Sequence, residues 1–318
     1  MGSILTACDV SRHEPGESMD FAAYYRLTEG RMLLRKPSLY LGDLVAEMRG
    51  ERKVKSTPLP WGRCAGLFEL REAEVTLLCG VNGHGKSLAV SQIETVACAY
   101  GEKVMTASFE MTPLAQLRRK LRQCARGDAP TEAFAKQMVS WLDGRWWVYD
   151  QQGTVPSPEV VFGVIRYAAQ ELGCTIMVID SLMKCIRSED DYNEQKEFVD
   201  RICALARELG VHIILVHHLR KGESEDTMPN KMDVKGSGSI TDQVDNVVLW
   251  WRNKKKERDL ASGKKTRDEV DELPDSMMLV EKQRNGEWEG RFSFWFHKGA
   301  LQFCADKRTW PVDLMVRA

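Results

Sequence analysis

The stretch that decides the fold is Gly80-Val-Asn-Gly-His-Gly-Lys-Ser87. It fits the phosphate-binding pattern G-x-x-x-x-G-K-[ST] at every fixed position. The apolar segment 75–79 before it predicts a strand, and the segment 87–99 after it predicts a helix. This context gives the pattern its meaning, because a strand–loop–helix unit can wrap backbone N–H groups around phosphate oxygens. The alternative is a glycine turn followed by Lys and Ser by chance.

In such a loop, glycines allow a close backbone approach, and the helix N-terminus adds positive potential. Lys86 is then expected to reach the β- and γ-phosphates of a nucleotide, and the Ser87 hydroxyl to ligate Mg²⁺. The expected nucleotide-binding residues are Gly80, Val81, Asn82, Gly83, His84, Gly85, Lys86 and Ser87.

From residue 67 onward, strand and helix patterns alternate. The runs 176–179 and 213–216 are apolar at every position, which is typical of parallel strands covered by helices on both faces. After residue 240 the segments 247–251, 277–281, 291–295 and 301–304 predict strands without helices between them, and we expect antiparallel additions to one edge. The predicted fold class is therefore α/β, a P-loop core around a central parallel sheet. The other expected strands are 103–109, 146–149, 175–180 and 212–217, and the other helices are 113–126, 157–172 and 193–209.

Polar side chains follow three of these strands and are expected to meet at one edge of the sheet. Asp180 is placed to hold Mg²⁺ through water, with an aspartate that caps a turn as the alternative. Glu110 is placed to polarise a water for attack on the γ-phosphate, or else to cap the next helix. His217-His218 end a third strand, where a polar side chain can sense the γ-phosphate, unless both are buried spacers.

Five segments together resemble the DnaB-like replicative helicases of the RecA-type ATPases, closest to the phage and mitochondrial primase–helicase branch. They are GVNGHGKS (80–87), SFEM (108–111), VIDSL (178–182), VHHLRK (216–221) with KGSGSI (235–240), and EKQRNG (281–286), in the family's order. The likeness covers roughly residues 60–305. It implies a RecA-like core that binds ATP and Mg²⁺, assembles as a hexamer, moves 5′→3′ on single-stranded DNA and unwinds duplex DNA.

The resemblance also implies roles for individual residues. Lys86 and Ser87 match the phosphate and metal residues, Glu110 the catalytic glutamate, Asp180 the Walker B aspartate and His218 the switch residue. Asp245 matches the acidic position before the next strand. Lys282 and Arg284 match the pair that reaches the γ-phosphate of a neighbouring subunit. Arg284 lies in a polar turn where it has little structural reason to be fixed, so that in trans it can stabilise transition-state charge; an ordinary turn arginine is the alternative.

The expected DNA grip is the loop Lys235, Gly236, Ser237, Gly238 and Ser239. Its glycines offer backbone N–H groups with little bulk beside one cation, which suits phosphate contacts without base readout. Lys184 and Arg187 are weaker candidates, because the acidic residues at 189–191 make that loop a poor phosphate grip.

Three parts of the chain are expected: an N-terminal arm and linker (1–59), the ATPase domain (60–305) and a tail (306–318). The arm contains a predicted helix 38–48, with Ser38 as its N-cap and an apolar stripe of Leu41, Leu44, Val45 and Met48 that we expect to dock on the adjacent subunit. The charged stretch 253–275 predicts a solvated hairpin or a partly disordered insertion rather than a DNA contact. The first 60 residues are too few for the family's helical collar or a primase module, so a separate primase or loader is a candidate partner.

Composition sets broader limits. The chain has 318 residues, 45 Lys and Arg, 46 Asp and Glu and a net charge of −1, which excludes a wholly basic nucleic-acid coat. Its nine cysteines are dispersed without metal spacing, so reduced thiols in a reducing compartment are expected. The resemblance implies that this compartment is a bacterial or phage-infected host cytoplasm. No apolar run is long enough to span a bilayer. Two alternative functions remain at this point: a RecA-type recombination or strand-exchange ATPase, and an ATP-gated single-strand clamp or loader.

Overall fold

The computed structural model describes residues 36–51, 54–150, 156–186, 191–220, 226–236, 238–308 and 310–316, except the side chain of Arg267. The chain divides into two compact units, Met1–Val54 and Lys55–Ala318. The second unit carries every described residue of the predicted nucleotide and DNA sites, and the two units are treated separately below.

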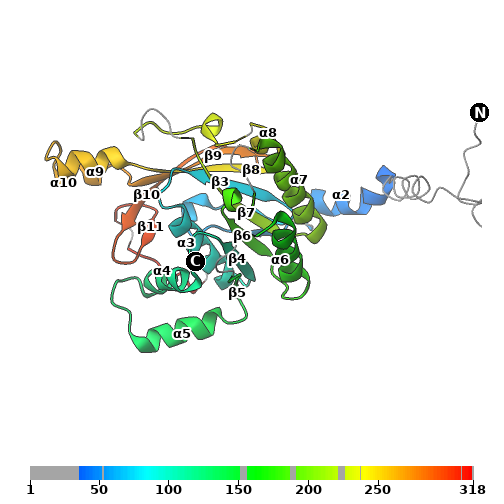
Figure 1. Ribbon diagram of the computed structural model, residues 1–318, viewed down its shortest axis with the longest axis horizontal. Coiled ribbons are helices and arrows are strands. Elements are labelled where there is room, and N and C mark those ends of the chain that lie inside the picture. The colour runs from blue at the N-terminus through cyan, green and yellow to red at the C-terminus, as the bar shows by residue number, and fades with distance from the viewer. Residues whose placement is uncertain are drawn as a thin grey trace, which may run out of the picture. The chain divides into compact units, whose positions relative to one another are not determined.

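A nine-stranded sheet organises the second unit (Figure 1), in the order β11-β10-β9-β8-β3-β7-β6-β4-β5. Strands β8, β3, β7, β6, β4 and β5 run parallel, and β9, β10 and β11 add antiparallel at one edge. The predicted α/β class is confirmed, and the segments 277–281, 291–295 and 301–304 are antiparallel as expected. The expectation that 247–251 is also antiparallel is wrong: it lies in β8, which pairs parallel with β3, because the long connection after β7 allows the crossover that a parallel strand needs. The strands are β3 (Val75–Gly80), β4 (Val104–Ser108), β5 (Trp146–Val148), β6 (Ile176–Asp180), β7 (His212–His218), β8 (Asn246–Arg252), β9 (Ser276–Gln283), β10 (Gly290–His297) and β11 (Gln302–Cys304).

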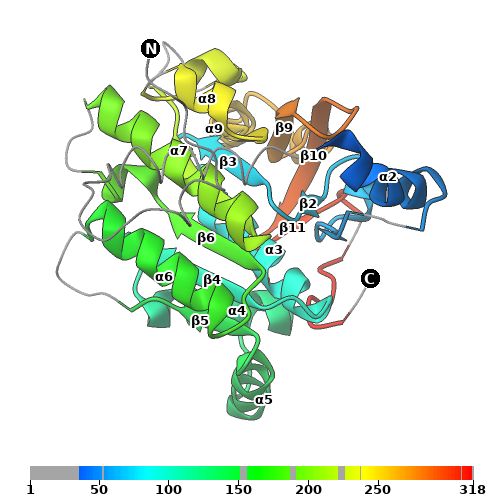
Figure 2. The ribbon, with the colours of Figure 1, turned by 90° about the vertical axis from the view of Figure 1, so that its right-hand side faces the viewer.

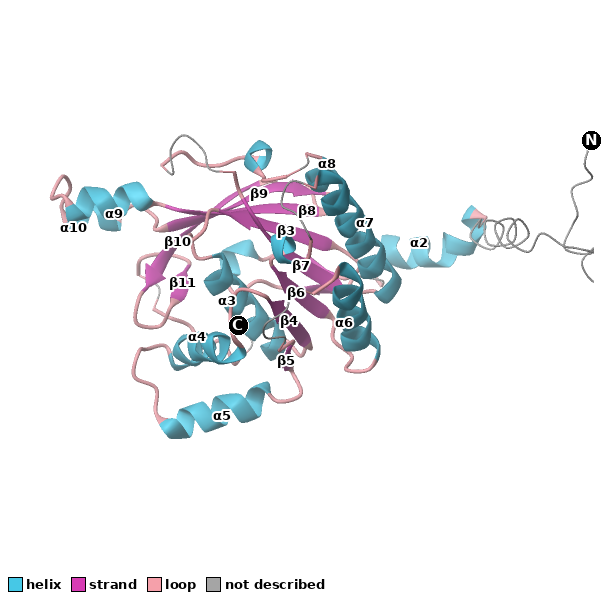
Figure 3. Cartoon of the chain, in the orientation of Figure 1, coloured by secondary structure: helices cyan, strands magenta, loops and turns pink. Residues whose placement is uncertain are grey.

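Helices cover both faces of this sheet, as Figures 2 and 3 show. On one face, α6 (Pro158–Gln170) and α7 (Tyr192–Leu209) pack on one set of alternating strand residues. On the other, α3 (Lys86–Ala99), α4 (Pro113–Ala125) and α5 (Glu132–Leu142) pack on the opposite set. Because each face has its own apolar layer, the central strands are buried throughout, which explains their uninterrupted apolar runs. Helix α5 was not predicted.

An aromatic cluster packs against the phosphate-binding loop. The rings of Trp250 and Phe294 stack at 5.4 Å, and Trp61 lies 4.5 Å from Phe294, centroid to centroid. The indole of Trp61 donates to the Phe303 carbonyl at 2.7 Å. The antiparallel edge strands thus contribute directly to the support of the loop, because Phe294 and Phe303 lie on β10 and β11.

The boundaries of this unit differ from the predicted ones. Strand β1 (Ser56–Thr57) pairs with β2 (Leu70–Arg71), and Leu59 is buried, so the compact unit begins at Lys55 and not at residue 60. The last residues of the expected arm and linker (1–59), from Lys55 onward, therefore belong to the domain, because burial of apolar residues such as Leu59 stabilises that packing. At the other end, Leu314 is buried and the Val312 N–H donates to Gln302, so the expected tail also packs on the domain.

The first unit is described from residue 36. A 3₁₀ turn, η2 (Pro37–Tyr40), leads into α2 (Leu41–Met48). The predicted N-cap at Ser38 is wrong: the residue before α2 is Tyr40, which makes no capping side-chain bond. Proline at position 37 starts the turn earlier, as its fixed φ favours. Leu41, Leu44 and Met48 are exposed. The arm residues 1–35 lie outside the described part of the chain.

The charged stretch after β8 forms two helices, α9 (Lys254–Ala261) and α10 (Arg267–Asp271), which extend beyond the ends of β8 and β9 in Figure 1. Lys256 is buried in an ion pair with Asp275 at 2.7 Å, and Val270 is fully buried. The prediction of a solvated hairpin missed this helical structure, because interleaved charges hide the few residues that pack. None of the helices within the described residues is long and apolar enough to cross a membrane.

Candidate active site

The phosphate-binding loop occupies the C-terminal end of β3 and the start of α3, as its sequence predicts. A Cβ on Gly80 would lie 2.6 Å from the Trp250 carbonyl oxygen, and one on Gly85, whose φ is +96°, would lie 2.9 Å from the Phe303 ring. These two glycines are therefore required by close packing and backbone conformation. Lys86 is buried and donates to the Gly80 carbonyl at 2.6 Å, and burial lowers the pKa of its ammonium.

His84, in the middle of this loop, is 1% exposed. Its Nδ1 accepts the Arg252 backbone N–H at 3.3 Å, and the Arg252 guanidinium donates to the Gly83 carbonyl at 3.2 Å. Glu257 on α9 holds that guanidinium with two hydrogen bonds. His84 thus fastens the loop to the end of β8, and it points away from the exposed surface of the loop formed by Asn82 and Gly83.

Three strand ends bring the predicted carboxylates and histidine together. Register pairs Gly80 of β3 with His218 of β7, and Ser108 of β4 with Asp180 of β6. The Ser87 hydroxyl donates to Asp180 at 3.2 Å. This pair supplies hard oxygen ligands, which suit Mg²⁺. Asp180 does not cap the following turn, because Ser181 occupies that position and makes no side-chain cap bond.

Glu110 lies at the same edge and contacts the expected switch residue. Its Oε1 is 3.4 Å from His218 Nε2 and accepts from the Ser181 hydroxyl at 3.1 Å. The alternative that Glu110 caps α4 is wrong, since Thr112 caps that helix through the Ala115 N–H. The hydrogen bond from His218 is the main cause that lowers the pKa of Glu110. Burial, followed by the Glu110 charge, raises the pKa of Asp180 to about 6.

A small depression beside Ser87 and Asp180 brings in side chains that the sequence analysis missed. Gln116 and Arg119 of α4 and Glu94 of α3 line it. Burial lowers the pKa of Arg119, and the Asp180 charge opposes that shift. No local pattern pointed to them: three consecutive cations at 118–120 span about 200° of the helix circumference, and a surface helix can present such an arc to solvent. Lys120, the third, is 1% exposed and pairs with Glu94 at 2.5 Å.

The predicted DNA loop is attached to the end of β7. The Lys235 N–H donates to the His218 carbonyl at 3.0 Å, His217 Nε2 lies 2.6 Å from the Lys235 carbonyl oxygen, and Arg220 donates to the Gly236 carbonyl at 2.9 Å. Gly236 is buried, whereas Gly238 is exposed and Ser239 begins α8 (Ser239–Gln243). The N–H of Lys235 is thus used within the chain and is not available to a DNA phosphate. Ser237 and Arg187 lie outside the described residues.

His217 and His218 have different surroundings. His217 is fully buried, and burial lowers its pKa to about 4. His218 faces Glu110. The adjacent histidines therefore point to opposite sides of β7, so that one meets the nucleotide edge and the other the base of the predicted DNA loop.

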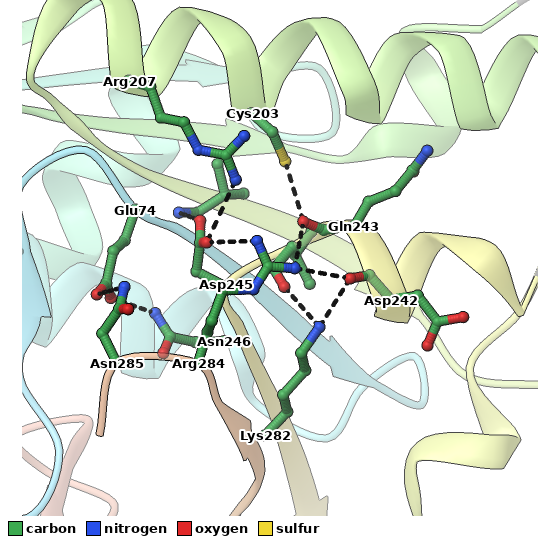
Figure 4. Close-up of polar contacts among 12 residues, drawn as sticks. Glu74, Cys203, Arg207, Asp242, Gln243, Asp245, Asn246, Lys282, Arg284 and Asn285 are labelled. Atoms are coloured by element: carbon green, nitrogen blue, oxygen red, sulfur yellow. Dashed lines mark hydrogen bonds and ion pairs between the residues drawn. The ribbon is translucent and has the colours of Figure 1, made fainter. Parts of the chain in front are cut away.

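Lys282 and Arg284 lie at the opposite ends of the strands from the phosphate-binding loop, where the parallel strand β8 begins. Figure 4 shows their contacts. Lys282 donates to the carbonyls of Thr241, Asp242 and Val244 at 2.8–2.9 Å, around the C-terminal end of α8. Arg284 donates to Asp245 at 3.1 Å and to the Asp242 carbonyl at 2.9 Å. The expectation that Arg284 has little structural reason to be fixed is wrong, because buried Asp245 holds it.

This edge is a full strand length away from the phosphate-binding loop of the same chain. Asp245 precedes β8, and Asn246 pairs with Thr76 at the start of β3, whereas the loop follows the end of β3 at Gly80. A strand of six residues spans roughly 17 Å, which exceeds the reach of an arginine side chain. Arg284 therefore cannot contact a nucleotide held by its own chain.

Comparison with known proteins identifies the family of this chain. Residues 66–305 match the family model for the DnaB-like helicase C terminal domain. The chain belongs to this family. A replicative DNA helicase DnaB from Leifsonia xyli subsp. xyli (strain CTCB07) is 32% identical over 126 residues, which cover 38% of this chain and 25% of that relative. The chain thus matches a quarter of the length of this relative.

Two solved structures share the fold of this DnaB-family domain. One is a DnaB-like replicative helicase described together with its interactions with primase, with a TM-score of 0.68, 17% identity, and coverage of 85% of this chain and 67% of that chain. The other is the ATPase domain of a second protein, with a TM-score of 0.69, 17% identity, and coverage of 85% of this chain and 98% of that chain. The predicted resemblance to DnaB-like helicases is confirmed.

Proposed function

We propose that this chain is the motor of a hexameric replicative DNA helicase, which hydrolyses ATP to move 5′→3′ along single-stranded DNA and to separate duplex DNA. One observation carries the proposal. Lys86, Glu110 and Asp180 lie at one edge of the sheet, and Arg284 lies at the other edge, held in place. A nucleotide can meet both sets only between two copies, and a repeated head-to-tail contact of this kind forms a ring where its rotation closes and a filament where it does not; we propose the ring.

At such an interface each residue has a chemical task. Lys86 neutralises charge on the β- and γ-phosphates. Glu110 accepts the proton of the attacking water, and its lowered pKa keeps the carboxylate ionised for this task. Ser87 and Asp180 would hold Mg²⁺, which supplies charge neutralisation when bound. Arg284 of the neighbouring copy stabilises charge on the γ-phosphate in the transition state.

Hydrolysis is coupled to DNA through β7 and the loop after it. His218 contacts Glu110. The preceding residue, His217, is hydrogen-bonded to the backbone carbonyl of Lys235. Loss of the γ-phosphate is thus relayed over two adjacent residues to the side chain of Lys235 and to Gly238 and Ser239. These groups would bind phosphates of one strand without reading bases, as a translocating ring requires.

The remaining partners follow from the same proposal. The exposed stripe of Leu41, Leu44 and Met48 on α2 would dock on the adjacent subunit, and a separate primase or loader would complete the replication machinery. All eight described cysteines are unpaired and buried, which supports folding in a reducing cytoplasm. Deletion of residues 1–50 should leave a folded chain that binds ATP but assembles poorly. If the truncated chain forms hexamers at the same concentration as the full chain, α2 does not contribute to the interface.

Complementation between two inactive chains tests the trans arrangement. Lys86→Ala and Arg284→Ala should each hydrolyse ATP at least ~10³-fold more slowly than the parent chain. When equal amounts are mixed and exchange is confirmed by mass, about a quarter of the interfaces pair an intact loop with an intact arginine. Activity should then return to roughly that fraction.

Arg291 provides a matched control, because it is an exposed arginine on the adjacent strand of the same hairpin. Arg291→Ala should keep full activity. Strand separation of a forked duplex, measured with ATP and with a non-hydrolysable analogue, tests the helicase assignment itself. An absence of rescue in verified mixed rings would refute catalysis between subunits, and ATP hydrolysis without strand separation would refute unwinding.

A further inference from the structure

Asp245 is a buried carboxylate at the edge of the sheet opposite the phosphate-binding loop, and its side chain is 5% exposed. One oxygen, Oδ2, accepts the Val75 N–H at 3.0 Å. The other, Oδ1, is shared by Arg284 at 3.1 Å and Arg207 at 3.4 Å. A carboxylate removed from water requires such partners, so this site is built from β3, α7 and the turn after β9.

We propose that Asp245 is a positioning residue for catalysis: it fixes the Arg284 guanidinium in the orientation from which it meets the ATP bound by the neighbouring subunit. This inference rests on the proposed function, since it concerns the same arginine and the same interface. Asp245 itself touches neither nucleotide nor DNA, and it acts only through Arg284.

The contacts of Arg284 support this assignment. Three of its bonds are made by terminal nitrogens, one to Asp245 and two to the carbonyls of Asp242 and Gln243. Its backbone N–H also donates to the Asp245 carbonyl at 2.9 Å. A guanidinium has five N–H groups, so two are left, and they have no partner within the described part of the chain. The side chain remains 41% exposed. A guanidinium that is held in one orientation and still exposed can bind an incoming phosphate.

Charge gives a second argument. Arg284 lies beside Lys282, and burial together with the Arg284 charge lowers the pKa of Lys282. Two cations repel each other, so without a negative charge between sheet and helix the arginine would turn toward solvent. The Asp245 carboxylate, which contacts Arg284 in Figure 4, opposes this repulsion. Positioning before the reaction matters because an ordered donor needs no reorganisation when charge develops.

Asp245→Asn tests the inference, because the amide has the same shape but no charge. With ATP as substrate, kcat should fall by about 10²-fold, as expected for a displaced catalytic group, whereas KM stays near the parent value. The double variant Asp245→Asn/Arg284→Ala should be no slower than Arg284→Ala alone, since both changes remove one function. Additive losses would overturn the proposal.

Mixing experiments separate positioning from a general structural role. Asp245→Asn should be rescued by Lys86→Ala chains, which provide an intact arginine, and should not be rescued by Arg284→Ala chains, which provide none. Rescue by Arg284→Ala would place the defect on the loop side and overturn the proposal. If Arg284→Ala and Lys86→Ala fail to rescue each other, the proposed function fails first.

Asp275→Asn is the matched control, because Asp275 likewise accepts a backbone N–H, from Phe296 at 2.8 Å, and pairs with a lysine. It should lower the melting temperature by a smaller amount, because its side chain is 27% exposed against 5% for Asp245, and it should leave kcat unchanged. Should Asp245→Asn not fold, Asp245→Glu replaces it: the charge is kept for Arg207, but the extra methylene moves it relative to Arg284. The same rescue pattern is then expected with a smaller loss, and parent kcat in either folded variant overturns the inference.

Discussion

Lys120→Met should destabilise the domain far more than loss of a surface lysine. Lys120 is 1% exposed and Glu94 4% exposed, with 2.5 Å between Nζ and Oε2. The ammonium also donates to the Ser91 carbonyl at 3.3 Å and lies 4.7 Å from the Trp146 ring centroid. Methionine fills much of the same volume but leaves the Glu94 carboxylate buried without its cation.

The expected magnitude follows from that burial. Removing one partner of a buried ion pair costs about 3–5 kcal/mol, because an uncompensated charge stays in the interior. For a domain of this size each kcal/mol shifts the melting temperature by roughly 2–4 °C, so a decrease of roughly 6–20 °C is expected. Glu94→Gln/Lys120→Met removes both charges, and the double variant should recover at least about 2 kcal/mol of the loss.

Urea unfolding followed by tryptophan fluorescence measures these differences. The control is Lys136→Met, which breaks an ion pair with Glu132 whose side chains are 77% and 82% exposed, and it should cost below about 0.5 kcal/mol. If Lys120→Met cost no more than the control, or if the double variant lost the sum of the single losses, the reasoning about the buried charge would be refuted.

Three further outcomes are expected. Glu110→Gln should bind ATP with parent affinity in a filter assay but lose hydrolysis, because an amide cannot accept the water's proton; loss of binding would contradict the role. Lys235→Ala should weaken single-strand binding equally for all sequences and reduce the salt slope by ~0.7, and an unchanged slope would place the contact elsewhere. Burial lowers the pKa of His212 and of His217 to about 4, so the unfolded chain binds more protons between pH 6.5 and 4; the free energy of unfolding should fall as pH falls through that window, by up to about 3 kcal/mol per histidine. A flat unfolding profile across it would contradict their neutral burial.

The sequence alone determined the parts of the molecule whose signals are local. The loop at 80–87 fixed a strand–loop–helix unit, since glycine conformation and one lysine suffice to define it. Apolar runs predicted the parallel strands, and the polar residues that end them predicted one catalytic edge. Local patterns also predicted the strands after residue 240, with the correct antiparallel pairing for three of the four; the parallel pairing of β8 with β3 was not predicted. Each of these inferences needs only neighbouring residues, which is why they agree with the sheet.

Only the tertiary structure decided how distant residues pair. Asp245 and Arg284 are 39 positions apart and Lys120 and Glu94 are 26 apart, and no period in the sequence relates them. Arg284 looked like an unrestrained turn residue because its acceptor arrives from another strand, and the charged run 118–120 gave no direct indication that its last member is buried. Pairing of this kind depends on sheet register and on the desolvation of both groups, and these exist only once the layers have packed.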